Sequence, residues 1–400
     1  MKICFISNLY QPYLIGGAEK YVEEIAGHLS KENEVVIITT KPYDGLNSLK
    51  PSVETQDKLK IYRFFPINVY HTYYAKKTNN LIKPFWHLID QWNPHSYFVV
   101  KNILKREMPD VVHTHNLGGL SLSTFYTVKS LDLPLVHTIH DYSLLCPNAM
   151  LLHSSGRICK HPKYPCKVYC CLKRKFTDYK PDMVSAPSQF VLDRHIKTRF
   201  FENSKTLKLP LGIELDDTKI NKDYETIDIL YVGQLAKHKG IPILIEAFKK
   251  VKTKNVRLCI IGKGPNMEWF EKLSEGDERI KIYGFISESK LREHYEQANI
   301  TVVPSIWYDN SPMVIYESFR RGTPVIGSRI GGIPELIEEG YNGFLFEPGN
   351  TEQLKTILAG LSEDSAKLEE LSINAFNSAK NYEIGRHIKK LTEIYKGLIR

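Results

Sequence analysis

Two carboxylates frame a short loop and the helix expected after it. Asp309 follows the apolar run 300–303, and Glu317 lies eight positions further on. The run predicts a buried parallel strand, and the helix is expected to begin with Ser311 as its cap and Pro312 at its first position. Loops at the carboxyl ends of parallel strands form the ligand crevice of α/β sheets, and carboxylates accept hydrogen bonds from hydroxyl groups. Both acids are therefore candidates for binding a ribose or a sugar.

Other side chains suited to chemistry occupy the ends of other predicted strands. Gly16 and Gly17 stand between the first strand and a helix, where backbone N–H groups can approach a phosphate, although ordinary turns also use glycine pairs. His140 ends another strand and is expected to face the same crevice.

The order of these segments resembles the nucleotide-sugar glycosyltransferases of family 4, which have the GT-B fold. The resemblance rests on G-G-A-E-K at 16–20, H-T-I-H-D-Y at 137–142, G-Q-L-A-K-H-K-G at 233–240 and the block 302–343. In that family the second acid binds the donor ribose and the first contacts the transferred sugar, while the histidine contacts the sugar near its reacting carbon. The resemblance therefore implies catalytic roles for His140, Lys239, Asp309 and Glu317.

The same resemblance implies a set of donor-binding residues. This set is Gly16, Gly17, Gln234, Lys239, Asp309, Ser311, Pro312, Met313, Val314 and Glu317.

Two positions in this set depart from the family pattern. Asp309 replaces the usual glutamate and is one methylene shorter. Gln234 stands where arginine is usual, so the leaving diphosphate is expected to depend on Lys239 and on backbone N–H groups. Lys237 is a nearby alternative cation without a family counterpart.

The expected reaction is retaining, metal-independent transfer of a hexosyl group. The chain contains no D-x-D motif that would suggest a diphosphate-bridging metal, so no cofactor is expected for catalysis. Relatives transfer through an oxocarbenium-like state with attack on the face that the diphosphate leaves. The expected donor is a UDP- or GDP-sugar, and the expected acceptor is a glycan or lipid-linked glycan in cell-surface polysaccharide, lipopolysaccharide or glycoconjugate synthesis.

Cysteines are concentrated in one segment. Five of the seven fall between residues 146 and 171. In a chain expected to be cytoplasmic, such clustering favours a metal site over disulfides, and the predicted ligands of a structural zinc are Cys146, Cys159, Cys166 and Cys170. Free thiols are the alternative.

The length of 400 residues favours two domains. Strand–helix alternation predicts an α/β fold of the GT-B type, with two Rossmann-like doubly wound domains facing each other across a cleft. The predicted acceptor-binding domain covers 1–208, with a C-terminal helix at about 383–400 packing back on it. The predicted nucleotide-sugar-binding domain covers 209–382.

Segment 70–106 is rich in both basic and aromatic residues and contains two tryptophans. This composition suits peripheral attachment to an anionic membrane surface, at the inner face for a cytoplasmic protein; a half-buried helical region is the alternative.

The formal net charge of +9 does not by itself identify a partner. We expect no nucleic-acid binding, because no zinc-finger spacing or RNP signature is present. A nucleotide-sugar 2-epimerase of the same fold, or a non-catalytic nucleotide-sugar or nucleic-acid-binding protein, are the alternative functions.

Overall fold

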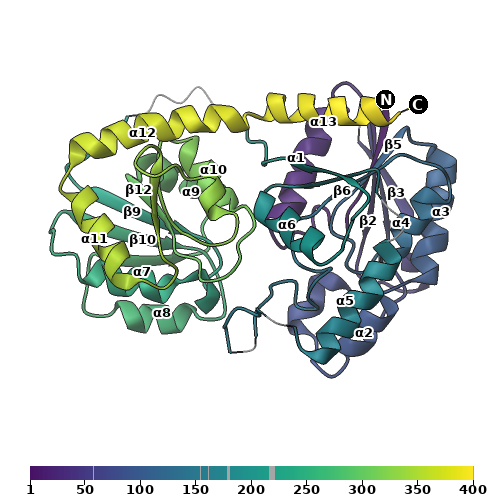
Figure 1. Ribbon diagram of the computed structural model, residues 1–400, viewed down its shortest axis with the longest axis horizontal. Helices are drawn as coiled ribbons and strands as arrows, with labels where there is room; N and C mark the ends of the chain where they lie inside the picture. Colours follow the sequence, from purple (N-terminus) through teal and green to yellow (C-terminus); the bar gives the residue numbers. More distant parts are fainter. Residues whose placement is uncertain (57, 154, 161, 178–180, 216–220, 400) are drawn as a thin grey trace. The chain divides into compact units, whose positions relative to one another are not determined.

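The chain folds into two compact α/β units. The structure, a computed structural model, describes all residues except 57, 154, 161, 178–180, 216–220 and 400. The first unit comprises residues 1–151, 160–210 and 388–400, and the second comprises 152–159 and 211–387. Figure 1 shows the two units and labels many of their helices and strands.

The first unit is built on a sheet of eight described strands in the order β3-β4-β2-β1-β5-β6-β7-β8. All neighbours are parallel except the edge pair β3–β4, which is antiparallel. The strands are β1 (Lys2–Ile6), β2 (Glu34–Thr40), β3 (Ser52–Gln56), β4 (Leu59–Phe64), β5 (Val111–Thr114), β6 (Leu135–Thr138), β7 (Met183–Ala186) and β8 (Lys205–Lys208). The helices are α1 (Gly17–Ser30), α2 (Lys83–Ile89), α3 (Pro94–Glu107), α4 (Ser123–Lys129), α5 (Tyr164–Thr177) and α6 (Gln189–Lys197).

The second unit is built on a parallel sheet of six described strands in the order β11-β10-β9-β12-β13-β14. The strands are β9 (Ile227–Val232), β10 (Val256–Ile261), β11 (Ile280–Gly284), β12 (Ile300–Val303), β13 (Val325–Ser328) and β14 (Gly343–Phe346). The helices are α7 (Ile241–Lys249), α8 (Met267–Ser274), α9 (Glu288–Gln297), α10 (Met313–Phe319), α11 (Thr351–Ser362) and α12 (Ser365–Ala379); α13 (Ile384–Leu398) starts in this unit and ends in the first.

Both sheets are doubly wound, because the strand order reverses direction from the centre outward. In the second unit, right-handed crossovers place α7 and α8 on one face of the sheet and α9 and α10 on the other (Figure 1). The apolar strand residues between them are almost fully buried, as are Phe248 and Phe270 on the first of these faces. The predicted α/β class is thus confirmed.

The start of α10 differs from the expected one. The helix begins at Met313 and Pro312 occupies the cap position, so Ser311 is not its cap. The Ser311 hydroxyl is instead 2.7 Å from the Tyr316 hydroxyl. Pro312 fixes the extended backbone before the helix and offers no side-chain cap bond.

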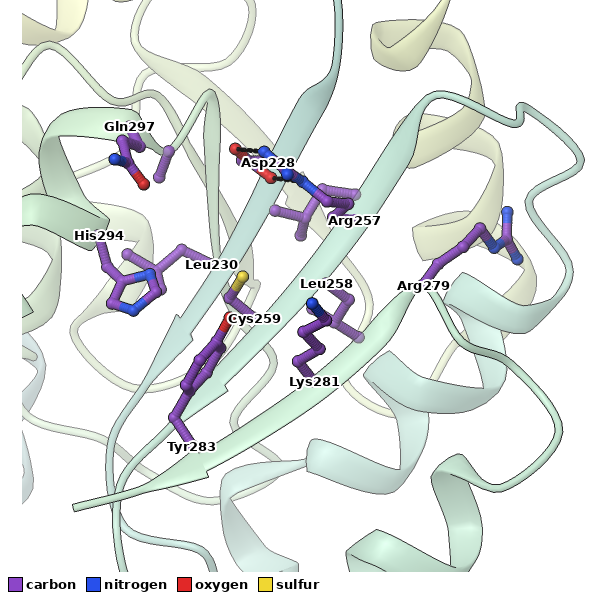
Figure 2. A pocket seen from close by; sticks show the side chains of 12 residues that line it. Asp228, Leu230, Arg257, Leu258, Cys259, Arg279, Lys281, Tyr283, His294 and Gln297 are labelled. Carbon is purple, nitrogen blue, oxygen red and sulfur yellow. Dashed lines mark hydrogen bonds and ion pairs between the residues drawn. The ribbon is translucent and has the colours of Figure 1, made fainter. Parts of the chain in front are cut away.

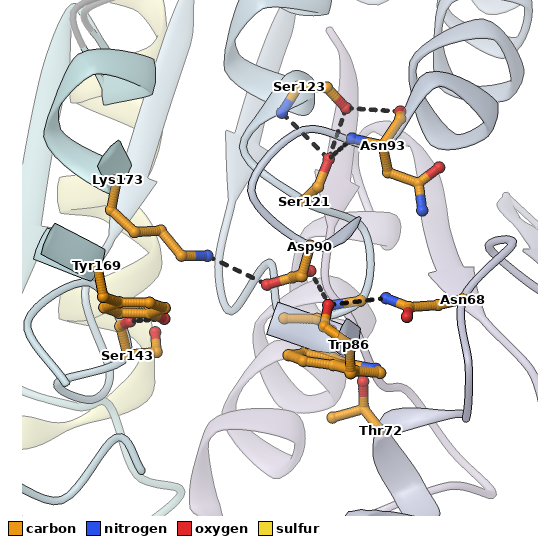
Figure 3. Close-up of polar contacts among 12 residues, drawn as sticks. Asn68, Thr72, Trp86, Asp90, Asn93, Ser121, Ser123, Ser143, Tyr169 and Lys173 are labelled. Carbon is orange, nitrogen blue, oxygen red and sulfur yellow. Dashed lines mark hydrogen bonds and ion pairs between the residues drawn. The ribbon is translucent and has the colours of Figure 1, made fainter. Parts of the chain in front are cut away.

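Helix α5, which carries three of the clustered cysteines, is attached to α2 and its following turn by buried polar contacts. Lys173 Nζ lies 3.1 Å from Asp90 Oδ2, and both side chains are almost fully buried. The other Asp90 oxygen accepts a hydrogen bond from the Gly119 backbone, and the Tyr169 hydroxyl donates to the Ser143 carbonyl (Figure 3). Removing one partner of a buried pair leaves an uncompensated charge, so this pair fixes where α5 lies.

Candidate functional site

The predicted charged residues of the second unit include a directly bonded pair. Lys239 Nζ lies 2.6 Å from Asp309 Oδ2, and the Ser305 hydroxyl donates to the same oxygen at 3.0 Å. The lysine also lies over the Trp307 ring, 5.0 Å from its centroid. Asp309 is only 8% exposed, so these partners are what stabilise its negative charge.

Glycines allow the loops that carry this pair to approach closely. Gly240 follows Lys239 with φ = +77°, and a Cβ there would lie 1.7 Å from the Pro304 carbonyl oxygen. Gly331 has φ = +63°, and its Cβ would lie 2.2 Å from the Asp309 carbonyl oxygen. Both positions therefore require glycine, which brings the loops after β9, β12 and β13 together at one edge of the sheet.

Glu317 lies on α10, in a different setting from Asp309. Its carboxylate is 2.7 Å from Arg320 one turn later, and its side chain is about a quarter exposed, at 27%. Met313 and Val314 form the first turn of the same helix, and Val314 packs against the buried Leu230 cluster. The helix thus places Glu317 and the predicted donor-binding residues at the same edge of the sheet as Asp309.

Gln234 and Lys237, the other two residues of this loop considered for the diphosphate, lie in different surroundings. The backbone carbonyl of Gln234 accepts a hydrogen bond from the Tyr231 hydroxyl at 3.0 Å, which fixes the backbone of this loop. Lys237 Nζ lies 4.6 Å from the centroid of the Trp269 ring. Lys237 is therefore engaged with an aromatic ring of α8, whereas Lys239 is the lysine that reaches the acid.

In the first unit, the predicted glycine pair lies at the start of α1. The Gly16 backbone N–H donates to Glu19 Oε2 at 2.8 Å. Glu19 is almost fully buried, and burial raises the pKa of its carboxyl group despite the backbone hydrogen bonds that lower it. A carboxylate thus occupies the helix end where a phosphate was expected, and a phosphate would have to replace it at Gly16.

His140 follows β6 and is paired with a histidine that the sequence reasoning missed. His115 Nδ1 lies 2.9 Å from His140 Nε2, and the two rings stack with centroids 5.2 Å apart. Burial lowers the pKa of His140 to about 4. Burial, together with neighbouring histidines, lowers the pKa of His115 well below its ordinary value. Both rings are therefore neutral at physiological pH.

A third histidine, His113, connects β5 with the end of α13. His113 Nδ1 lies 2.7 Å from the Tyr395 hydroxyl, and its Nε2 lies 2.7 Å from the Thr138 hydroxyl. Thr138 is in turn 2.7 Å from the Ser185 hydroxyl on β7. These contacts fix the part of the sheet from which His115 and His140 extend.

The clustered cysteines are free thiols in the structure. Cys170 Sγ donates to the Leu145 carbonyl at 2.9 Å. Burial raises the pKa of Cys170 to about 11, with further contributions from Cys166 and Cys146, so its thiolate form is disfavoured without a cation. Within the described part of the chain, no three His, Cys, Asp or Glu side chains are arranged to hold a metal. A structural zinc at Cys146, Cys159, Cys166 and Cys170 stays a prediction.

A separate pocket lies on the sheet of the second unit, and none of the predicted site residues lines it (Figure 2). Helix α9 packs against β9 and leaves one face of β10 and β11 open, where Lys281 and Tyr283 are exposed. Arg257 is held there by a two-pronged ion pair with Asp228, at 2.7 and 2.6 Å. The pocket is lined by residues of β9, β10 and β11 and by His294 and Gln297 of α9, and not by the loops that carry Lys239 and Asp309, so it is distinct from the predicted donor site.

Solved structures of similar fold identify the architecture. Sucrose-phosphate synthase from Thermosynechococcus elongatus matches with a TM-score of 0.75 at 17% identity, covering 99% of this chain and 98% of that one. Anabaena Alr3699/HepE in complex with UDP matches with a TM-score of 0.72 at 20% identity, covering both chains completely. These neighbours are GT-B enzymes, and the fold of the chain is therefore GT-B, as predicted.

The sequence comparisons identify the family. Residues 15–217, about half of the chain, match Glycosyltransferase Family 4, and residues 213–378 match Glycosyl transferases group 1. An uncharacterized 42.6 kDa protein in the cps region of Klebsiella pneumoniae is 27% identical over 84% of this chain and 87% of its own length. The alpha-D-kanosaminyltransferase of Streptomyces kanamyceticus is 25% identical over 79% of this chain and 85% of its own. The chain belongs to glycosyltransferase family 4.

Proposed function

We propose that this glycosyltransferase transfers a hexosyl group from a UDP- or GDP-sugar to a glycan or lipid-linked glycan, with retention of configuration and without a catalytic metal. The observation that carries the proposal is the Lys239–Asp309 pair at the loop edge of the second sheet. A fixed cation there suits a leaving diphosphate, and a buried acid beside it suits sugar hydroxyl groups.

Each side chain has a defined task in the proposed reaction. Lys239 stabilises the charge that develops on the diphosphate as its bond to the sugar carbon breaks. Glu317 binds the ribose hydroxyl groups and Asp309 those of the transferred sugar. His140, which is neutral, offers a hydrogen bond near the reacting carbon.

The bonds and protons of this step balance without an enzyme nucleophile. The acceptor oxygen forms its bond to the sugar carbon on the face that the diphosphate leaves, and the acceptor proton passes to a diphosphate oxygen. The transition state resembles an oxocarbenium ion. Metal independence is inferred from the absence of a D-x-D motif in the sequence and from the presence of Lys239.

The acceptor class is supported by relatives. The AmsK protein of Erwinia amylovora, named an amylovoran biosynthesis glycosyltransferase, is 28% identical over 44% of this chain and 46% of its own. The donor class is supported by the HepE structures with UDP and UDP-glucose. We extend these substrate classes, nucleotide sugar and polysaccharide intermediate, to this protein.

A thermal-shift panel of UDP, GDP, ADP and their sugars identifies the donor. A ligand present at 100 times its Kd is expected to stabilise the chain by about 2.7 kcal/mol. The donor that binds is then incubated with acceptors in EDTA, and NMR determines the anomeric configuration of the product. Inversion would contradict the retaining mechanism, loss of activity in EDTA would contradict metal independence, and epimerisation of the donor without acceptor would favour the alternative enzyme.

We also propose that α2 and α5 attach the enzyme to an anionic membrane surface. Phe85 and Leu88 on α2 are 62% and 67% exposed, and Val168 and Leu172 lie one turn apart on α5 at 42% and 38%. Exposed lysines, including Lys163 and Lys167, flank the α5 residues. Apolar side chains flanked by lysines on packed helices suit the lipid headgroup region. Among the described residues, no helix is long and apolar enough to cross a bilayer.

Vesicle sedimentation tests this attachment. Replacing Phe85, Leu88 and Val168 by glutamate is expected to abolish binding to vesicles containing phosphatidylserine, while nucleotide affinity remains unchanged. Ile373→Glu is the matched control, because Ile373 is 53% exposed on α12 of the second unit. Equal vesicle binding by the triple variant and the control would contradict the assignment of this surface.

A further inference from the structure

His115 contacts His140 and is itself buried. The His115 side chain is fully buried, and its Nδ1 lies 2.9 Å from His140 Nε2. Its other ring nitrogen, Nε2, is buried and has no hydrogen-bond partner among the residues that the structure describes. The Tyr21 ring lies against both histidines, with centroid distances of 5.9 Å and 5.4 Å.

The unpartnered nitrogen decides which histidine donates. In a neutral imidazole one nitrogen carries the proton and the other accepts. If His140 donated, the proton of His115 would be on its Nε2, which would leave a buried N–H without an acceptor. If His115 donates from Nδ1, only an unprotonated nitrogen lacks a partner. An orphaned buried N–H is the rarer and costlier arrangement, so the second alternative is favoured.

The residues around His115 favour its neutral form and fix the position of its ring. His113 lies beside His115 with centroids 4.3 Å apart, and both of its ring nitrogens are engaged by the hydroxyls of Tyr395 and Thr138. Phe5 lies on another side of His115, at 5.7 Å. His115 is therefore surrounded by rings rather than by charges, which disfavours a charged imidazolium.

We propose that His115 is a positioning residue that donates from Nδ1 to His140 Nε2 and so holds His140 in the tautomer with its proton on Nδ1. In this tautomer, the Nδ1 nitrogen of His140 is a hydrogen-bond donor. A donor of this kind suits a sugar hydroxyl or the developing charge near the reacting carbon, whereas the opposite tautomer would present an acceptor. Only this last use of the donor depends on the proposed function.

Imidazole 15N NMR of the full-length protein, labelled at histidine, tests the tautomer without any substrate. In the wild type, His140, assigned by comparison with His140→Gln, is expected to be protonated on Nδ1. In His115→Leu, which cannot donate, the proton of His140 is expected to redistribute toward Nε2. In His115→Asn the side-chain amide can still donate, so the wild-type tautomer is expected to return. A wild-type His140 protonated on Nε2, or a tautomer unchanged in His115→Leu, would overturn the proposal.

Kinetics separate the positioning role from a merely structural one. His115→Leu is expected to lower kcat about tenfold with little change in the KM of the donor, because one hydrogen bond to the transition state is misdirected. His115→Asn is expected to recover most of kcat. A Leu variant with a raised KM and unchanged kcat, or an Asn variant as slow as Leu, would contradict the positioning role. If the NMR result holds but no sugar is transferred, the proposed function fails and the positioning contact remains.

Discussion

The loop edges of the two sheets differ in how they carry charge. In the second unit, Lys239 and Asp309 are charged and directly paired. In the first unit, His115 and His140 are neutral and contact each other, and the hydroxyl groups of Thr138 and Tyr395 contact the neighbouring His113. Fixed charge can compensate a leaving diphosphate, whereas neutral donors can orient a sugar without binding an anion strongly. Under the proposed function, the charged pair of the second unit serves the diphosphate and the neutral histidines of the first unit serve the sugar.

The largest expected effect is acid destabilisation confined to the first unit. Burial lowers the pKa of His137 to about 3 and of His71, His87, His140 and His195 to about 4. The unfolded chain binds protons at these histidines below about pH 6.5, while the folded chain does not until about pH 4. Stability is therefore lost as the pH falls from about 6.5 to about 4, at up to about 1.4 kcal/mol per histidine and pH unit.

Calorimetry combined with limited proteolysis measures this difference. Between pH 7 and pH 5 the first unit should melt earlier and be cleaved first, while the second should change little. In the second unit, burial lowers the pKa of His294, which is one histidine against the five of the first unit named above. Earlier cleavage within 211–387 would contradict the prediction that the first unit is the more acid-sensitive of the two.

The next largest effect is expected on kcat when the positive charge of Lys239 is removed. Lys239→Met is expected to lower kcat roughly 100-fold to 1000-fold, the range for removing one preorganised stabilising group at a transition state. Steady-state kinetics with the identified donor measures it. Lys237→Met is the matched control two residues away; because that lysine contacts Trp269 rather than an acid, its kcat should remain within about threefold of wild type. Similar losses in both variants would remove the distinction between these two lysines.

A smaller effect is expected for the neutral donor of the first unit. His140→Ala should lower kcat roughly 10-fold to 100-fold, equivalent to about 1.4–2.7 kcal/mol, because a hydrogen bond rather than a full charge is removed. The same assay measures it, and thermal unfolding shows whether the variant remains folded. A loss larger than that of Lys239→Met would reverse the order of importance of the two units.

The smallest effect is expected when a positive charge is added to the second unit at Gln234. Gln234→Arg places the cation usual in the family beside the loop of Lys239 and should raise kcat or tighten product binding a few-fold, because charge-assisted hydrogen bonds are about twice as strong as neutral ones. Gln234→Ala should change little. Inhibition by the nucleoside diphosphate product, measured for both variants, distinguishes the two results. A decrease in both properties for the arginine variant would show that a second cation does not fit there.

Most of the fold could be predicted because it is encoded locally. Apolar runs followed by glycine or proline indicated strands such as β9 and β12. The antiparallel edge strand β3 was missed, because all five of its residues are exposed and no apolar pattern marks it. Helix α10 begins at Met313 rather than after a Ser311 cap, because the Ser311 hydroxyl contacts Tyr316.

The predicted site was less accessible to sequence reasoning, since its contacts join distant segments. Lys239 and Asp309 were identified separately, but their ion pair depends on the sheet order that makes β9 and β12 neighbours. His115 was missed for the same reason, because His140 approaches it only when β5 pairs with β6. One contact had a local signal: Glu19 three residues after Gly16 has the spacing of a capping box, so its bond to the Gly16 N–H could have been anticipated.

The glycines of the second unit also determine how its loop edge tolerates sequence change. Besides Gly240 and Gly331, a Cβ on Gly262 would lie 1.8 Å from the Gly233 carbonyl oxygen, and one on Gly264 would lie 2.2 Å from that of Leu235. Each of these obstacles is backbone, which cannot rotate away as a side chain can. In a saturation library selected for folded protein, these four positions should be depleted of every other residue, alanine included. Gly276 and Gly349, whose Cβ positions are open, should show only the milder cost of a positive φ.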